Sequence, residues 1–230
     1  MNTVVAPSVP VERHQRVSLL WRALRLWRTR IGLLIAGALV AIAIFGPFIA
    51  PYGPQEFAGS PYQPAGGKLL FGADNLGQDV WSRFLDGGRS ILIVSVLSTI
   101  LGVGVGVLVG LSAALARRSV DDLLMRAVDL LLAFPSILLA LVAVATVGPK
   151  SWLIVLTVAA TTMPRTARVI RGAGVSVVER DFVTAARAIG DGHFRVLLFE
   201  VLPNVTGTLV VEATLRLTYA IGLIAALAFL

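Results

Sequence analysis

The chain has 230 residues, of which 57% are hydrophobic and 14% are charged, and its formal net charge is +7. Soluble domains typically carry about 25% charged residues, so this composition excludes an ordinary soluble domain. The chain has no cysteine, which excludes disulfides, zinc–thiolate sites and iron–sulfur ligation. A nucleic-acid partner would need a basic face along a polar segment, but the arginines flank apolar stretches instead. We therefore interpret the chain as a membrane protein.

Residues 1–30 are predicted to form a cytoplasmic tail that ends in an amphipathic helix. Its arginines alternate with leucine and tryptophan from residue 16 onwards, a pattern typical of a helix on an anionic membrane surface. The first membrane span is predicted over residues 31–50. A cleavable signal peptide would have a shorter apolar core, so we expect this helix to stay uncleaved.

Residues 51–89 are predicted to form an extracytoplasmic segment, because they are rich in glycine and proline and too polar to span a membrane. Near its end, Val80, Trp81, Phe84 and Leu85 share one helical face. We expect this short helix to rest on the outer membrane–water boundary.

Residues 90–230 are predicted to form a membrane core with four further spans. These spans cover residues 90–114, 123–147, 152–163 and 205–230. Pro135 removes a backbone hydrogen bond inside the second of the four, so a kink is expected there. The helix of the short 152–163 span is expected to continue past Pro164.

Three glycines, Gly102, Gly106 and Gly110, recur every four residues inside an apolar stretch. A phosphate-binding loop would have to lie between a strand and a helix, which this position does not offer. Small residues at this spacing let another helix approach closely, so we interpret them as a helix-packing face.

The orientation in the membrane follows from the distribution of Lys and Arg. Segments 1–30, 115–126 and 164–204 together hold 15 of these residues, whereas segments 51–89 and 148–151 hold 4. The positive-inside rule therefore places the N-terminus and the 164–204 loop in the cytoplasm.

Few charges fall inside the predicted spans. Asp129 lies three residues after Arg126, and we expect these two to form an ion pair near the inner end of their span. Glu212 and Arg216 lie four residues apart on one face of the last span. They could neutralise each other within the helix or form a polar strip on a translocation path, and both interpretations place them away from lipid.

No arrangement of residues is typical of catalysis. The two histidines, His14 and His193, lie far apart, and the sequence contains no Ser/His/Asp set and no HExxH motif. We therefore expect no enzymatic activity, no metal and no cofactor in this chain.

The 164–204 loop carries the pattern that is most informative about function. Residues 181–190 are predicted to form a helix that ends at a glycine break, and residues 191–203 a second helix. One interpretation is a solvated helix without a partner. The other is a helix that docks into a groove on a soluble motor subunit.

The spacing of this loop resembles the coupling motif of ATP-binding-cassette importer permeases. The matching residues are Thr184, Ala185, Ala186, Gly190, Leu202 and Pro203. That family usually has Glu where Thr184 stands, which affects one polar contact to the motor. Residues 71–84 and 120–136 are similar to segments of the dipeptide/oligopeptide/nickel branch, which usually has Arg where Gln78 stands.

This resemblance implies an all-α, polytopic type I importer transmembrane domain with six spans, five of which are visible. The chain would be the permease subunit of an ATP-driven, binding-protein-dependent importer for di- or oligopeptides in the bacterial inner membrane. Its partners would be a second homologous permease, two cytoplasmic ATPases that bind ATP and Mg, and an extracytoplasmic substrate-binding protein. The residues expected to couple to an ATPase are Thr184, Ala185, Ala186, Arg187, Gly190, Leu202 and Pro203.

Two other classes of protein are alternatives. A secondary or proton-coupled transporter using Glu212, Arg216 and Asp129 would show paired broken helices or inverted halves, which are not visible in the sequence. A membrane-bound assembly factor would have no transport role. We also expect the native chain to continue into a sixth span, because the sequence stops on an apolar run. A natural five-span variant is the alternative, which an intact mass near 24.3 kDa would indicate.

Overall fold

The structure is a computed structural model that describes residues 26–229. The chain divides into two compact units, Met1–Gly88 and Arg89–Leu230. Most of the predicted N-terminal amphipathic helix lies outside the described residues. Its last part, from Trp27, forms the first turn of α2 (Trp27–Ile49).

Most of the described residues are helical apart from the loop between residues 50 and 79, and they include three isolated β-bridges and no strand. Four of the helical stretches are long and apolar enough to cross a membrane, and a bent pair of shorter helices makes a fifth candidate. The prediction of an all-helical, membrane-spanning fold with five visible spans is therefore confirmed.

The first unit contains α2, a loop and the start of α3. Almost all apolar side chains of α2 are exposed, which is expected of a helix that faces lipid. Near its end, α2 packs closely on the first turns of α3. A Cβ placed at Gly46 would come within 2.5 Å of the Leu85 carbonyl oxygen, so only glycine fits at this crossing.

The helix α3 (Val80–Leu115) corrects one prediction. It is a single helix of 36 residues, about 54 Å long, so the expected interfacial helix is its first part and not a separate element. The glycines at 87 and 88 do not break it, because one glycine costs a helix only about 1 kcal/mol. The predicted apolar face persists there, and the rings of Trp81 and Phe84 stack 5.7 Å apart.

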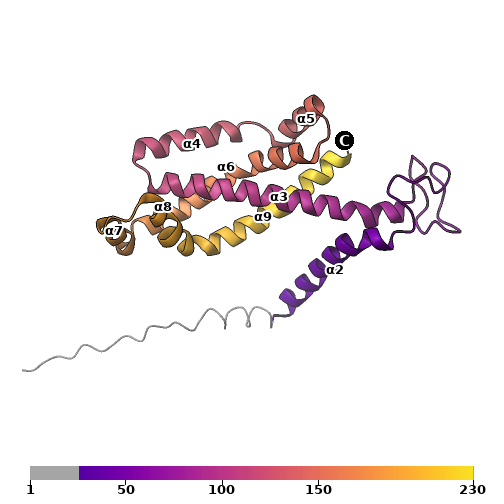
Figure 1. The fold of residues 1–230 in the computed structure, drawn as a ribbon, viewed down its shortest axis with the longest axis horizontal. Coiled ribbons are helices and arrows are strands. Elements are labelled where there is room, and N and C mark those ends of the chain that lie inside the picture. The colour runs from indigo at the N-terminus through magenta and orange to yellow at the C-terminus, as the bar shows by residue number, and fades with distance from the viewer. Residues whose placement is uncertain (1–25, 230) are drawn as a thin grey trace, which may run out of the picture. The chain divides into compact units, whose positions relative to one another are not determined.

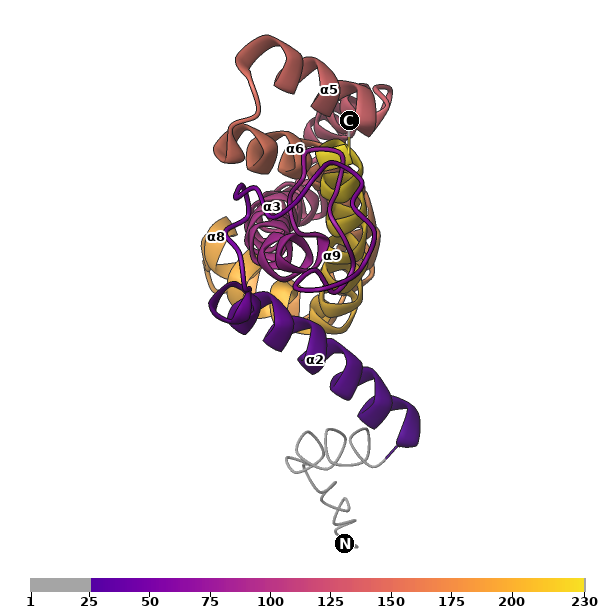
Figure 2. The same cartoon turned by 90° about the vertical axis from the view of Figure 1, so that its right-hand side faces the viewer.

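The second unit is a bundle of the remaining part of α3 with α4 (Arg118–Leu132), α5 (Ser136–Val147), α6 (Ser151–Val178) and α9 (Thr206–Phe229). The short helices α7 and α8 lie at one end, and α5 lies at the other together with the end of α9 (Figure 1). The turned view places α5 at the edge of this unit, next to α6 (Figure 2).

Both predictions that concern proline are confirmed. The axis bends by 71° between α4 and α5, where Pro135 immediately precedes α5. This is a full break of the helix, because proline disfavours helical backbone in the residue before it. The helix α6 runs through Pro164 without interruption and ends at Val178.

The predicted glycine face of α3 packs against α6. A Cβ at Gly102 would lie 2.9 Å from the Ala159 carbonyl oxygen, and a Cβ at Gly106 would lie 2.8 Å from that of Met163. Ala167 approaches Gly110 in the same way, one turn further along. The interpretation of these glycines as a helix-packing face is confirmed, since backbone-to-backbone contact over three turns leaves no room for larger residues.

Candidate functional site

The helix α7 (Asp181–Ala188) ends in a Schellman motif around Gly190. The Asp191 amide donates to the Ala186 carbonyl oxygen at 3.1 Å, and the Gly190 amide donates to the Arg187 carbonyl oxygen at 3.1 Å. Gly190 has a φ of +92°, which non-glycine residues rarely adopt. The predicted helix and glycine break are thus present, and the glycine is needed for its backbone conformation.

The two faces of α7 have different environments. Val183 and Ala186 are buried in the core that α7 shares with α3, α6 and the segment after α8. Thr184, Ala185 and Arg187 are exposed on the opposite face. Ala186, expected to couple to an ATPase, therefore anchors α7 to its own bundle and offers no surface to a partner.

The segment after the glycine break is one continuous helical rod of mixed type. It consists of α8 (His193–Arg195), a π-helical stretch (Val196–Val201) and a 3-10 turn (Leu202–Val205), and it continues directly into α9. Of the expected coupling residues here, Leu202 is partly buried against the core and Pro203 is exposed in the 3-10 turn. This rod therefore connects the turn after α7 directly to α9.

An apolar and basic surface surrounds α7. Ile189 is 82% exposed, and Phe182 of α7 and Phe194 of α8 are also exposed. A cavity of about 430 Å³ at this end of the bundle is lined by Leu115, Ala116, Arg117, Arg187, Asp191, His193 and Val196. Exposed aromatic and aliphatic groups with arginine at their margin are typical of protein interfaces. Neither Ile189 nor the two phenylalanines were among the residues predicted to couple to an ATPase, because the sequence does not show which side of a short helix is covered.

Glu212 and Arg216 form an ion pair in the structure, with 2.6 Å between Oε1 of the glutamate and Nε of the arginine. Their side chains are only 5% and 11% exposed, respectively. The Thr166 hydroxyl of α6 also donates to Glu212 at 3.3 Å, and the Arg216 guanidinium lies 5.6 Å from the centre of the Tyr219 ring. The pair is therefore held between α6 and α9, where charges must be compensated.

The partner predicted for Asp129 is wrong. Asp129 pairs with Arg168 of α6 instead of Arg126 of its own helix. Nearer the start of α4, Asp121 forms a bidentate ion pair with Arg171, at 2.5 Å for each hydrogen bond. Both pairs join α4 to α6, and such long-range partners cannot be read from spacing along one helix.

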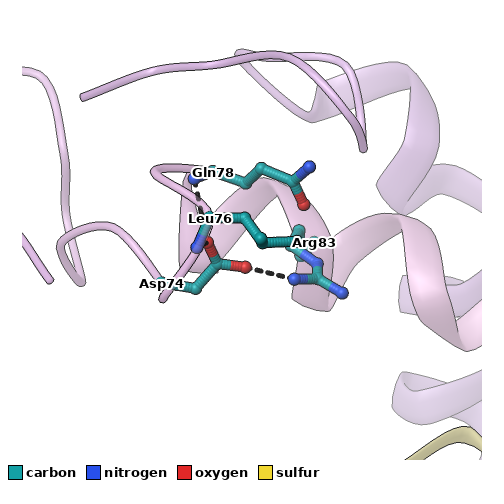
Figure 3. Close-up of polar contacts among 4 residues, drawn as sticks. All are labelled: Asp74, Leu76, Gln78 and Arg83. Carbon is teal, nitrogen blue, oxygen red and sulfur yellow. Dashed lines mark hydrogen bonds and ion pairs between the residues drawn. The ribbon is translucent and has the colours of Figure 1, made fainter. Parts of the chain in front are cut away.

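In the first unit, a polar turn immediately precedes α3. The Asp74 carboxylate accepts hydrogen bonds from the amides of Gln78 at 3.0 Å and Leu76 at 2.8 Å, and it pairs with Arg83 (Figure 3). The Gln78 amide, the Leu76 amide and the Arg83 guanidinium hold the pKa of Asp74 below its ordinary value, although partial burial opposes them. Gln78 therefore contributes to this turn through its backbone amide. The presence of Gln where the related branch usually has Arg leaves that contact intact.

Among the described residues, no group of His, Asp or Glu is arranged to hold a metal ion. The geometry instead defines a class of protein, namely a polytopic helical membrane protein. A capped, partly apolar helix lies at one end of its bundle, and a buried ion pair lies inside it.

Comparison with known proteins identifies the family. The chain belongs to the family described as the binding-protein-dependent transport system inner membrane component, whose model matches residues 102–230. Residues 19–65 match a second model, the N-terminal TM domain of oligopeptide transport permease C.

Two relatives show how far the similarity extends. The chain is 38% identical over 206 residues to the di/tripeptide transport system permease protein DppC of Pseudomonas aeruginosa, covering 86% of this chain and 68% of the relative. It is 36% identical over 210 residues to a protein of Brucella suis named as a peptide transport system permease protein, covering 91% of this chain and 71% of that relative.

Membership in this family confirms the identification based on the coupling motif. The chain is the permease subunit of an ATP-driven, binding-protein-dependent importer and has the type I transmembrane fold. The same finding favours this function over a secondary or proton-coupled transporter.

Proposed function

We propose that this permease transports di- or oligopeptides and that α7 is its coupling helix, docked on a cytoplasmic ATPase. The peptide substrate is supported by the names of both relatives and by the permease model that matches residues 19–65. The observation that carries the coupling role is the two-faced α7, which is anchored in the core by Val183 and Ala186 and exposed on the other side.

The docking surface consists of the exposed residues around α7. Thr184, Ala185 and Arg187 present small and basic groups, and Ile189 adds an apolar group. A short helix with an apolar contact surface suits a groove on a partner protein. Thr184 offers a hydroxyl where the family usually has a carboxylate, so the ATPase contact at this position is a neutral hydrogen bond.

Coupling follows from the packing behind α7. ATP and Mg bind to the ATPases, and closure of these subunits displaces α7 together with the rod that leads into α9. Gly190, Leu202 and Pro203 then act as positioning residues: the glycine caps α7, Leu202 packs on the core, and Pro203 lies where the rod enters α9. Because α9 also carries Glu212 and Arg216, the motion reaches the interior of the bundle.

The remaining features of the machine belong to the same proposal. The N-terminus and the part of the 164–204 loop that follows α6 lie in the cytoplasm, and residues 51–89 face the extracytoplasmic binding protein. A second permease completes the translocation path, on which Glu212 and Arg216 form a polar strip. The catalysis of ATP hydrolysis belongs entirely to the partner ATPases.

Cross-linking tests the docking. Because the chain has no cysteine, a single introduced cysteine is its only thiol. Ala185→Cys or Arg187→Cys should form cross-links to an ATPase subunit in the assembled transporter. Lys150→Cys, just before α6 at its other end, serves as the control and should form none. Failure of both α7 positions to reach an ATPase would refute the docking role.

Uptake into vesicles tests the transport activity. Vesicles that contain the permeases and ATPases should accumulate a radiolabelled dipeptide or oligopeptide only when the binding protein and ATP are both supplied. Accumulation driven by a proton gradient without ATP would contradict the proposal.

A further inference from the structure

A cavity of about 300 Å³ lies between α6 and α9, next to the Glu212–Arg216 pair, with Ser136 of α5 at its edge. Its size is at the lower end of cavities that hold small ligands, about 300–1,000 Å³. Its polar lining comes from Ser136, Thr161, Thr162, Arg165, Arg216, Thr218 and Tyr219. No prediction from the sequence singled out Arg165 or the threonines.

The cavity carries an uncompensated positive charge. Arg216 is neutralised by Glu212, but no described carboxylate lies within 4 Å of Arg165. Arg165 follows 14 residues after the start of α6, about 21 Å along a helix long enough to span the membrane. A charge at such a depth is costly unless it faces water or a counter-ion. The cavity therefore favours an anion.

The hydroxyl groups restrict which anion fits. Thr161 and Thr162 both donate to the Val158 carbonyl oxygen, at 2.9 and 2.6 Å, and Thr218 donates to that of Thr214 at 3.1 Å. Their protons are thus used within the helices, and their oxygens can accept hydrogen bonds from a ligand. The donors that remain for an anion are the guanidinium groups, which hold carboxylates well, and the hydroxyls of Ser136 and Tyr219.

This combination of guanidinium donors and hydroxyl acceptors matches the end of a peptide, where a carboxylate adjoins an amide N–H. We propose that the cavity binds the C-terminal carboxylate of the transported peptide during its passage, with Arg165 as the main partner and the threonine oxygens accepting from the neighbouring amide. This inference rests on the proposed peptide transport and names the part of the substrate that the permease recognises.

A cysteine reporter measures the charge of the cavity directly. Thr161→Cys in the assembled transporter is allowed to react with two methanethiosulfonates of similar size, one carrying a sulfonate and one a trimethylammonium group. The ratio of the anionic to the cationic rate should be at least about tenfold higher than at the exposed control Ser151→Cys, because a nearby unit charge attracts one reagent and repels the other. Adding Arg165→Gln should bring the ratio down to that of the control, whereas Arg165→Lys should preserve it.

Protection by ligands then identifies the anion. A dipeptide with a free C-terminus should slow the labelling of Thr161→Cys, while its C-terminal amide should not. Equal protection by the amide, or equal protection by inorganic phosphate or chloride at the same concentration, would overturn the assignment to a peptide carboxylate. So would a cysteine that reacts with neither reagent, since the cavity would then be closed to water. Thr218→Cys on α9 is the second reporter if the first variant fails to assemble.

The transport assay separates the two proposals. ATP-dependent uptake of free and amidated peptides at equal rates, with binding to the extracytoplasmic protein measured separately, would refute carboxylate recognition and leave peptide transport intact. Absence of uptake for every peptide would refute the proposed function itself.

Discussion

Replacement of Gly190 should separate ATP hydrolysis from transport. Its φ of +92° lies in the left-handed region, and a Cβ added there would meet no described atom within 4 Å. The cost of a substitution is therefore conformational and not steric. For an L-residue it is roughly 1–2 kcal/mol, which changes the population of the capped conformation by a factor of about 5–30.

The strained cap would lose its two 3.1 Å hydrogen bonds to the carbonyl oxygens of Ala186 and Arg187. The chain would then leave α7 in another direction, and α7 could not keep both its core contacts and its exposed face in place. Gly190→Val should be worse than Gly190→Ala, because a β-branched residue tolerates positive φ least. Insertion into the membrane should be unaffected, since the spans do not depend on this turn.

The assay compares ATP hydrolysis with peptide uptake in vesicles. In Gly190→Val we expect hydrolysis that no longer responds to the loaded binding protein, with uptake reduced by about the factor above. Gly190→Asn should retain more coupling, because asparagine tolerates the left-handed region. The matched control is Gly192→Ala, since Gly192 has a φ of −66° and open space around a Cβ. Equal effects at positions 190 and 192 would refute the reasoning.

Three further predictions concern other parts of the chain. Glu212→Gln and Arg216→Leu should each reduce the thermal stability of the purified subunit more than the double variant does. Each single change leaves a buried charge unpaired, at a cost of about 3–5 kcal/mol. Equal, mild effects of both single variants and the double variant would indicate a hydrated site. The pKa of Asp74 is lowered in the folded protein, so its carboxylate stabilises the turn at pH values above its ordinary pKa of 3.8, and this contribution is lost as the pH falls through the folded pKa. The resistance of the loop to proteases should therefore fall in acid. Asp74→Asn should lack this part of the pH dependence. Gly106→Leu should separate α3 from α6, since its Cβ would lie 2.8 Å from a carbonyl oxygen; it should lower the yield of folded protein, whereas Gly104→Leu, with open space, should not.

The sequence by itself determined the membrane architecture. Runs of apolar residues of spanning length predict helices, and proline and glycine act locally on the backbone, so the break at Pro135 and the cap at Gly190 could be predicted. The glycine repeat also identified a packing face, because its period matches the helix. The segment proposed to couple to the ATPase was singled out by its resemblance to a family motif, and not by a period of the helix.

Tertiary structure decided which residues face each other. Asp129 pairs with Arg168 and not with its helical neighbour Arg126, since the choice of partner depends on how α4 lies against α6. Ala186 points into the core although its neighbour Ala185 is exposed, and α7 is too short for periodicity to show which face is covered. In the sequence, Arg165 is one of several arginines in the 164–204 loop. The packing of α6 against α9 brings it beside Arg216 in one cavity. Periodicity is a property of one helix, whereas ion pairs, buried faces and cavities are properties of at least two, and this is why only the packed bundle determined them.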